Sequence, residues 1–207
     1  MKTLSKAVAI ASLVSASALT AQVANAEVEY SAQIDSMYLF RGTDNGTGGL
    51  ISASIDYAHD SGLYVGTWIA SAPEYDLYVG YAAEFGGVGV DVSLATYAYS
   101  NAGDVTAEPG GEVEAIVGLS YMDASFSYAM GLEELDESTY MTLGYSVAGA
   151  DLTYGMSDDG AGAEYSHLDV SYGLTEELSL TLSKAFDDTA GVSEDLIVLV
   201  SYALPIK

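Results

Sequence analysis

The sequence lacks cysteine altogether and is poor in basic residues, with only 5 lysines and arginines and 2 histidines among 207 residues. Without cysteine the chain has no disulfide and no thiolate for catalysis or metal binding. Two histidines leave little for a histidine-rich metal centre. The 30 acidic residues give a formal net charge of −25, which excludes a nucleic-acid binder that works through its own basic patches. We therefore expect no cofactor, no metal centre and no nucleic-acid partner.

Long hydrophobic runs are also missing after the first 26 residues, so no later segment suits a membrane-spanning helix. Half of the residues are nevertheless hydrophobic, far more than a disordered acidic chain carries. The acidic and the apolar residues must therefore be separated in space. Tyrosine dominates the aromatic residues, with 17 Tyr against 4 Phe and 1 Trp, and this bias favours strands over helices.

The first 26 residues differ from the rest of the chain. Lys2 and Lys6 precede a short apolar stretch over 7–19, and Ala24-Asn25-Ala26 is a typical A-x-A cleavage pattern. These features predict a secretory signal peptide over 1–26 and a single mature domain over 27–207. The alternative is an amphipathic first helix that is retained.

Alternation with a period of two residues runs down the mature chain. In the first segment Val28, Tyr30 and Ala32 share one face, whereas Glu29 and Ser31 share the other. The pattern recurs in about twelve segments. Most of them are about nine to eleven residues long, which is the length of a tilted membrane-spanning strand. The orientation of Leu63 to Ser71 stays ambiguous because both of its faces are apolar.

The connections between these segments alternate between long and tight, apart from a short third connection near Ala72-Pro73. Outer-membrane barrels carry long loops on the outer rim and short turns on the periplasmic rim. The sequence therefore predicts an all-β fold, an up-and-down antiparallel transmembrane β-barrel of about 12 strands. A soluble two-sheet sandwich would show the same alternation.

Aromatic residues on the apolar faces concentrate near the predicted strand ends, as in the interfacial belts of membrane proteins. A sandwich core would place them in mid-strand just as readily. Lys184 shares the apolar face and is expected to reach a lipid phosphate at the outer rim. The predicted lipid-interface anchors near the short-turn rim are Tyr57, Phe85, Tyr121, Phe126, Tyr172 and Tyr202, and those near the long-loop rim are Tyr38, Phe40, Tyr75 and Phe186.

The opposite face carries acids, serine, threonine and glycine, as a wet lumen would. The predicted lumen-lining charges are Asp35, Asp56, Asp76, Glu84, Asp91, Glu112, Glu114, Asp151, Asp169 and Arg41. Arg41 is the only arginine; either it forms a structural ion pair or it is a fixed positive charge in an acidic bore. Further narrowing of the bore is expected from Tyr78, Tyr97, Tyr99 and Tyr140.

Three stretches carry a family resemblance: residues 38–42 (YLFRG), Asp56-Tyr57 followed by 59–68 (HDSGLYVGTW), and 74–81 (EYDLYVGY). This pattern resembles the gcw_chp family of uncharacterised proteobacterial outer-membrane proteins, most strongly over residues 27–99. The resemblance implies an outer-membrane barrel but no activity and no catalytic residues. The chain departs from many outer-membrane barrels by ending in Leu204-Pro205-Ile206-Lys207 rather than in an aromatic residue.

Two other kinds of chemistry are weaker alternatives. His167 and Asp169 share a polar face near the long-loop rim and are either part of a hydrolytic rim site or a solvated pair. No serine lies in a recognisable nucleophile motif, and His59 in a tight turn suits turn stabilisation. The acidic loops around Asp158-Asp159 and Asp187-Asp188 are either a solvated rim or loose calcium ligands without EF-hand spacing.

The sequence thus favours a narrow, porin-like passive channel for small solutes with cation preference, rather than an enzyme. The alternatives are a structural or adhesive barrel with a side-chain-filled lumen and a soluble secreted all-β binding protein. We expect export through the periplasm to the cell outer membrane. The expected partners are membrane lipid and lipopolysaccharide, the barrel assembly machinery, and small solutes or cations; the sequence leaves the oligomeric state open.

Cleavage after Ala26 is the first testable expectation, because the two lysines, the short apolar stretch and the A-x-A pattern all precede that bond. Intact-mass measurement of the exported protein should show a chain that begins at Glu27. Retention of Met1 to Ala26 in the exported protein would falsify the signal-peptide prediction.

Overall fold

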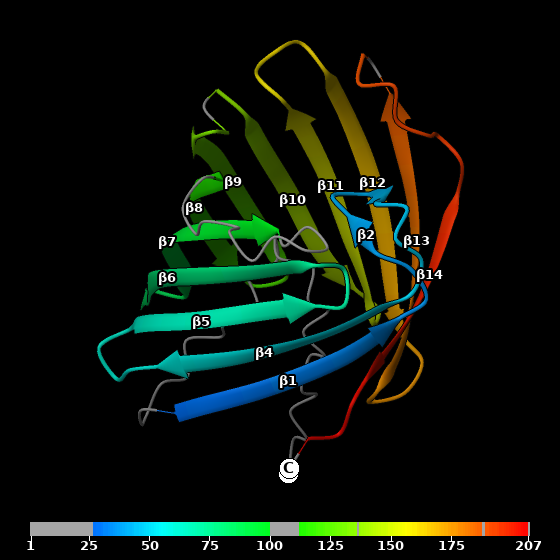
Figure 1. Cartoon of the computed structure of the whole chain (residues 1–207). Coiled ribbons are helices and arrows are strands. Elements are labelled where there is room, and N and C mark those ends of the chain that lie inside the picture. The colour runs from blue at the N-terminus through cyan, green and yellow to red at the C-terminus, as the bar shows by residue number, and fades with distance from the viewer. Residues whose placement is uncertain (1–26, 100–111, 136, 188, 207) are drawn as a thin grey trace.

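The computed structural model describes residues 27–99, 112–135, 137–187 and 189–206, which form a single closed β-barrel (Figure 1). The predicted signal peptide over 1–26 and most of the connection over 100–111 lie outside the described residues. The twelve barrel strands are β1 (Glu27–Asp35), β4 (Leu50–Ala58), β5 (Leu63–Ala70), β6 (Glu74–Phe85), β7 (Val88–Tyr99), β8 (Glu112–Tyr121), β9 (Ala124–Glu133), β10 (Thr139–Val147), β11 (Ala150–Asp158), β12 (Glu164–Gly173), β13 (Leu178–Asp187) and β14 (Ile197–Ala203). The prediction of an up-and-down antiparallel barrel is confirmed.

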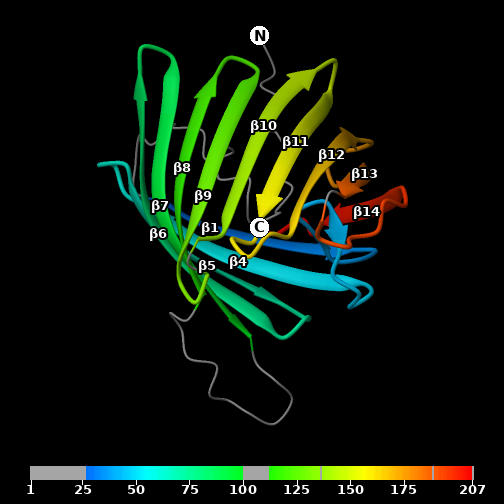
Figure 2. The ribbon, with the colours of Figure 1, turned by 90° about the horizontal axis from the view of Figure 1, so that it is seen from above.

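Each strand pairs with its neighbours in sequence, and β1 closes the barrel by pairing with both β4 and β14 (Figure 2). The two sides of β1 differ in extent. Its pairing with β4 runs over all nine residues of β1, from Glu27 to Asp35. Its pairing with β14 covers only three residue pairs, Gln33 with Ala203, Ile34 with Tyr202 and Asp35 with Ser201. Two further backbone bonds extend this contact, from the N–H of Leu204 to the carbonyl of Ala32 and from the N–H of Ser36 to the carbonyl of Val200.

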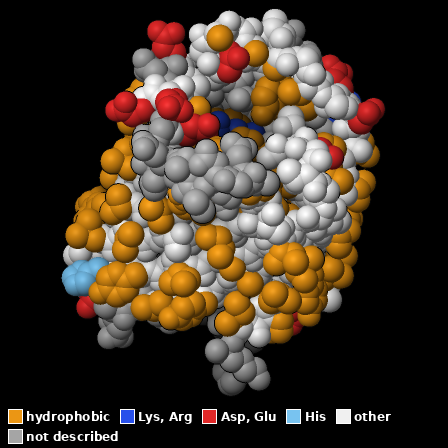
Figure 3. Space-filling view, viewed as in Figure 1, with side chains coloured by type: hydrophobic (Ala, Val, Ile, Leu, Met, Phe, Trp, Pro, Cys, Tyr) orange, Lys and Arg blue, Asp and Glu red, His pale blue; other side chains and the backbone are white. Residues whose placement is uncertain are grey.

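The period-two pattern becomes an apolar outer face and a buried inner face. In β5, Val65 and Ile69 are 51% and 54% exposed, whereas Tyr64 and Trp68 are 7% and 4% exposed. This settles the strand whose orientation the sequence left ambiguous, with Tyr64 and Trp68 pointing inward. Orange apolar side chains cover the outside of the barrel in Figure 3. An apolar outer face of this kind suits a barrel whose outside contacts lipid.

The connections follow the predicted alternation between the two rims. Two-residue turns join β6 to β7, β8 to β9 and β10 to β11 on one rim. In the last two of these turns Met122 and Ala148 adopt positive φ angles of 52° and 54°. The other rim carries the connections over 36–49, 134–138, 159–163 and 188–196, with the short 71–73 as the exception. Figure 3 shows acidic side chains gathered around the hollow at this long-loop rim.

The first connection differs from the sequence prediction. Tyr38 and Phe40 were predicted on the lipid face of an extended first strand, but β1 ends at Asp35 and the chain turns into the barrel. There it forms a small hairpin of β2 (Leu39–Phe40) and β3 (Thr43–Asp44). Tyr38 is 6% exposed and packs with Leu50 and Trp68, and Phe40 packs against the same cluster. These aromatic side chains are therefore part of the interior and not of a lipid-facing belt.

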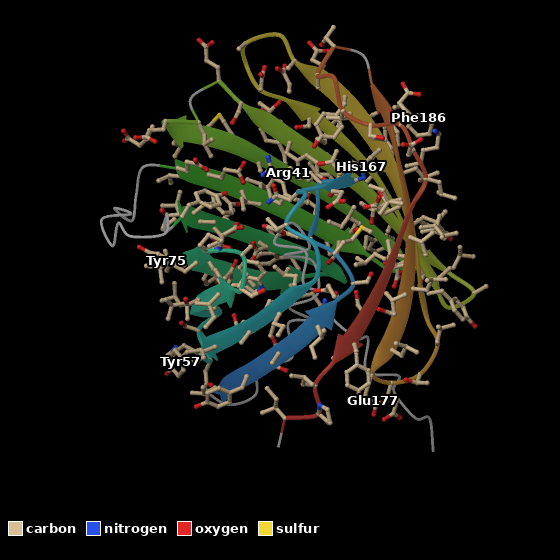
Figure 4. The ribbon with its side chains drawn as sticks, turned by 45° about the vertical axis from the view of Figure 1, so that its right-hand side comes forward. Arg41, Tyr57, Tyr75, His167, Glu177 and Phe186 are labelled. Carbon is tan, nitrogen blue, oxygen red and sulfur yellow. The ribbon has the colours of Figure 1, made fainter. Side chains whose placement is uncertain are left out.

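Most predicted anchors do lie on the outer face. Tyr57, Phe85, Tyr121, Tyr172 and Tyr202 are exposed, and Phe126 is half-buried. Figure 4 shows Tyr57, Tyr75 and Phe186 pointing away from the barrel axis. Their role at a lipid interface stays a prediction.

Lys184 also belongs to the outer face, opposite Leu168 of β12. Its Nζ donates a hydrogen bond to the backbone carbonyl of Glu194 and lies 5.7 Å from the ring centroid of Phe186. The loop over 188–196 thus already supplies an oxygen for this ammonium group. Contact with a lipid phosphate stays a prediction.

No helix among the described residues is long and apolar enough to cross a membrane. The closed sheet pairs its strands around the whole barrel, and such closure makes membrane barrels resistant to detergent.

We expect an unheated sample in detergent to migrate differently on a gel from a boiled one, because boiling opens the hydrogen-bonded barrel. Far-ultraviolet circular dichroism should show strand and little helix. Identical mobility with and without heating would count against a closed barrel in solution.

Candidate channel lumen

An inward-folded hairpin occupies part of the barrel interior. Leu39 pairs with Asp44 and Phe40 with Thr43, so that Arg41 and Gly42 form a two-residue turn. Both turn residues have positive φ, 48° for Arg41 and 78° for Gly42, as a hairpin turn of this length requires. Arginine in the left-handed backbone conformation, with a positive φ, costs about 1–2 kcal/mol relative to glycine. Its presence at the tip therefore points to a task for the side chain.

We call residues 38–45 the lumen hairpin, and side chains of β12 and β13 hold the backbone at its tip. Tyr165 donates from Oη to the carbonyl of Arg41 at 3.1 Å, and Ser183 donates from Oγ to the carbonyl of Gly42 at 3.1 Å. A Cβ on Gly42 would lie 2.2 Å from Cγ of His167, so only glycine fits against that ring. The tip thus rests on β12 and β13 while its two ends return to β1 and β4.

The side chain of Arg41 crosses the interior to Glu114 of β8. Its Nη2 lies 2.6 Å from Oε1 and 2.7 Å from Oε2 of Glu114. Tyr97 donates a further hydrogen bond from Oη to Oε2 at 2.7 Å. The guanidinium group stacks 4.5 Å from the ring centroid of Tyr140 and 5.0 Å from that of Phe40. Glu114 is only 1% exposed, so the pair is shielded from water.

Arg41 reaches the lumen by a route that differs from the one predicted from the sequence. The sequence placed it on the inner face of an extended first strand, whereas the structure brings it inward on the lumen hairpin. Figure 4 shows Arg41 and His167 inside the ring of strands. Of the two hypotheses for Arg41, the structure supports the ion pair, since its charge meets that of Glu114.

His167 lies beneath the same hairpin and not on an open rim. Its Nε2 is 2.7 Å from Oη of Tyr140, and its Nδ1 is 3.1 Å from Oδ1 of Asp169. The residue is 1% exposed, and Gly42 packs on its ring. Both ring nitrogens are engaged and the ring is covered. The structure therefore does not form the accessible rim site that the hydrolase hypothesis requires.

Other carboxylates of the inner wall accept hydrogen bonds from neutral donors. Tyr64 donates from Oη to both oxygens of Asp91, at 3.0 and 2.8 Å. Asp56 accepts from Tyr78 of β6, two strands away, and from Ser54. Such donors satisfy the carboxyl oxygens without adding a positive charge, so no cation accompanies these acids.

The long-loop half of the lumen continues this pattern. Gln33 donates from Nε2 to Oδ1 of Asp35 at 2.8 Å, and Tyr38 donates from Oη to Oε2 of Glu74 at 2.8 Å. Glu112 is half-buried at the start of β8. These contacts place a band of carboxylates near the lumen hairpin.

Asp76 differs from every other inner-wall acid named above. It is 0% exposed, yet neither of its carboxylate oxygens has a hydrogen-bond partner among the residues described. Two neighbouring side chains are also incompletely bonded. Oε1 of Glu74 has no donor and Nε1 of Trp68 has no acceptor within the described chain. Sequence alternation identified Asp76 as inward-facing but gave no sign of this unsatisfied set.

The predicted lumen charges of the short-turn half lie away from this band, and two of them are exposed. Glu84 is exposed near the short-turn end of β6, and Asp151 is exposed at the start of β11, where it accepts from Oγ of Ser146 at 2.5 Å. The predicted charges therefore form a band on the long-loop half and scattered acids at the other rim, rather than one continuous lining.

Within the described residues, no group of three or more His, Asp or Glu side chains gathers closely enough to hold a metal ion. The loop acids instead bind their own backbone. Asp159 accepts from the backbone N–H of Ala163 at 2.9 Å and of Ala161 at 2.8 Å. These hydrogen bonds lower the pKa of Asp159. The calcium interpretation of this loop gains no support.

Replacing Arg41 by Met should cost about 3–5 kcal/mol in the free energy of unfolding, because Glu114 would be left buried without its cation. The double variant Arg41→Met, Glu114→Gln should cost clearly less than the sum of the two single variants. Urea titration of the refolded barrel in detergent micelles gives these values. Lys184→Met is the matched control, with an expected cost of about 0–1 kcal/mol for an exposed cation. Additive single-variant costs would contradict the coupling.

Comparison with solved structures identifies porins of the same fold. The "KdgM porin" matches with a TM-score of 0.50 at 8% identity, over 84% of this chain and 96% of that chain. The "KdgM porin in complex with disordered oligogalacturonate" matches with a TM-score of 0.51 at 9% identity, over 87% of this chain and 100% of that chain. At this identity the likeness shows the fold alone.

The outer membrane phospholipase A from Escherichia coli has a TM-score of 0.47 at 11% identity, over 86% of this chain and 89% of that chain. No curated protein sequence matches this chain. The profile of one family, described as "Bacterial protein of unknown function (Gcw_chp)", matches residues 21–197. Because this match covers most of the chain and agrees with the barrel fold, the chain belongs to the Gcw_chp family.

Proposed function

We propose that this porin-like barrel is a narrow passive channel of the bacterial outer membrane that admits small solutes and prefers cations. One observation carries the proposal: inner-wall carboxylates are bonded to neutral donors, and the one arginine of the lumen is already paired with Glu114. Carboxyl groups therefore outnumber basic groups on the inner wall, and no free cation faces them among the described residues. Acidic walls in a confined bore attract cations and repel anions.

The dimensions support a narrow passage. Twelve strands spaced about 4.8 Å apart and tilted by about 40° give a backbone diameter of roughly 24 Å. Inward tyrosines and the lumen hairpin occupy much of that width. Tyr97 and Tyr140 are almost fully buried in the interior, whereas Tyr99 is 41% exposed. Small ions suit such a bore better than bulky solutes.

The apolar outer face supports an outer-membrane location, reached by export through the periplasm. The partners that go with this location are lipid and lipopolysaccharide around the barrel, and the assembly machinery that inserts it. The exposed aromatic residues near the strand ends are proposed as interfacial anchors.

A second candidate is a structural or adhesive barrel with a closed lumen. A specific observation favours it. The lumen hairpin and two apolar clusters fill parts of the interior, one around Tyr38 and Trp68 and the other around Tyr97, Ile116 and Tyr140. Electrical recording separates the two candidates, since only an open bore conducts.

In planar bilayers under a KCl gradient, the mature protein should show reversal potentials that indicate potassium preference. This preference should fade toward 1 M salt, where the Debye length is about 3 Å. The combined variant Glu74→Gln, Asp76→Asn, Asp91→Asn, Glu112→Gln should reduce it, because it removes four lumen charges.

The matched control removes four acids of the short turns instead, Asp60→Asn, Asp123→Asn, Glu176→Gln and Glu177→Gln. The net charge changes equally, but the lumen band stays intact, so selectivity should change less. Anion preference, or equal effects of the two variants, would contradict the proposal. Absence of any conductance would favour the closed structural barrel.

A further inference from the structure

We propose that Asp76, Glu74 and Trp68 form a binding subsite for a small primary ammonium ion that carries a neutral oxygen acceptor. The proposal deepens the channel function and rests on it, because the ligand must enter through the lumen. The site lies on the inner wall of β5 and β6, near the long-loop rim. It is separate from the Arg41–Glu114 pair.

The subsite is defined by polar atoms that the described protein leaves without partners. Asp76 contributes two acceptor oxygens and is 0% exposed, and Glu74, 4% exposed, contributes the acceptor Oε1. Trp68, 4% exposed, contributes one donor, Nε1. Burying a carboxylate without hydrogen bonds is costly, so such a set signals a missing partner. A primary ammonium group has three N–H donors, which matches the three free acceptor atoms.

These side chains are brought together by sheet register. Asp76 of β6 pairs directly with Trp68 of β5, and Glu74 pairs with Ala70, two residues further along the same inner face. On the other side Asp76 pairs with Tyr97 of β7. The register therefore places the unsatisfied carboxylate between two aromatic side chains.

The chemistry of this wall favours an organic cation over a metal ion. Within the described chain, no third His, Asp or Glu joins Asp76 and Glu74 closely enough to complete a metal site. Aromatic rings instead flank the carboxylate, and they attract the positive charge of an ammonium ion while packing against its carbon atoms. Nε1 of Trp68 needs an acceptor, which a hydroxyl group on the ligand supplies. An amino alcohol combines these features, whereas an anion is repelled by the acidic wall.

Tyr38 of the lumen hairpin covers this subsite. Its ring lies 6.2 Å from that of Trp68, and its Oη donates to Oε2 of Glu74 at 2.8 Å. Asp76 is fully buried, so a ligand must displace a side chain to reach it, and we infer that this side chain is Tyr38, which contacts both Trp68 and Glu74. The ammonium group then binds Oε1 of Glu74, the carboxylate oxygen that Tyr38 leaves without a donor in the closed state. Tyr38 thus acts as a lid at the base of the lumen hairpin.

The chain contains a single tryptophan, Trp68, so its fluorescence reports on this site directly. We expect ethanolamine hydrochloride, added to the mature protein in detergent at neutral pH, to change this fluorescence with saturation. Potassium chloride keeps the ionic strength constant, and ethylene glycol is the neutral analogue of the probe. Neither should give the saturable change.

Asp76→Asn should weaken ethanolamine binding by at least about tenfold, which corresponds to roughly 1.4 kcal/mol. Asp91→Asn is the matched control, since Asp91 is a buried inner-wall acid that Tyr64 already satisfies. Its affinity should stay within about twofold of the wild-type value. Tyr38→Phe removes the bond to Glu74, loosens the lid and should tighten binding. Heat-modifiable gel mobility shows whether each variant is folded.

Three results would overturn the subsite: no saturable response of the wild-type protein, equal affinity in folded Asp76→Asn, or an equal response to potassium or ethylene glycol. Bilayer recordings keep this failure distinct from failure of the channel. Potassium preference without ethanolamine binding removes the subsite and leaves the channel in place. Binding without conductance retains the subsite and removes the channel.

Discussion

The pairing of Arg41 with Glu114 is the interaction on which the interior depends. Among the described residues, β2 and β3 of the lumen hairpin pair only with each other, so side chains of the barrel wall set the position of the tip. Tyr165 and Ser183 bind its carbonyl groups, but only the ion pair reaches across to β8. A buried pair of this kind adds little net stability compared with apolar packing, yet it fixes position strongly because either charge alone is costly.

The remaining acids follow a different rule. The described lumen satisfies most of them with tyrosine, serine and glutamine donors, which compensate hydrogen-bonding capacity but not charge. This agrees with the scarcity of lysine and arginine in the chain, since hydroxyl and amide groups supply the donors. If arginine side chains neutralised the lumen acids, the chain would contain more arginine. The tyrosines also bring ring surface, which builds the two apolar clusters inside a bore that is otherwise polar.

Much of the barrel was predictable because side chains alternate with a period of two along each strand, and because short turns lie on one rim and long loops on the other. Tyr64 and Trp68 could not be placed because every residue around them is apolar or small, and their side is fixed only by pairing with β4 and β6. The lumen hairpin was missed for a physical reason as well. Tyr38 and Phe40 continue the alternation of β1, and only the Arg41-Gly42 pair, which adopts positive φ, signals a turn. The unsatisfied Asp76 is beyond sequence reasoning, since hydrogen-bond partners depend on three-dimensional contact.

The short contact between β1 and β14 has a consequence for the surrounding bilayer. Among the described residues, no strand pairs with the β14-facing edge of β1 over residues 27–31, where β1 extends beyond the end of β14. Hydrocarbon cannot hydrogen-bond the amide groups of that edge, so polar headgroups and water must reach them. In a membrane the hydrophobic thickness on this side is therefore shorter than around the rest of the barrel. Where the apolar band of a barrel is shorter on one side, local thinning of the bilayer or a tilt of the barrel accommodates the difference.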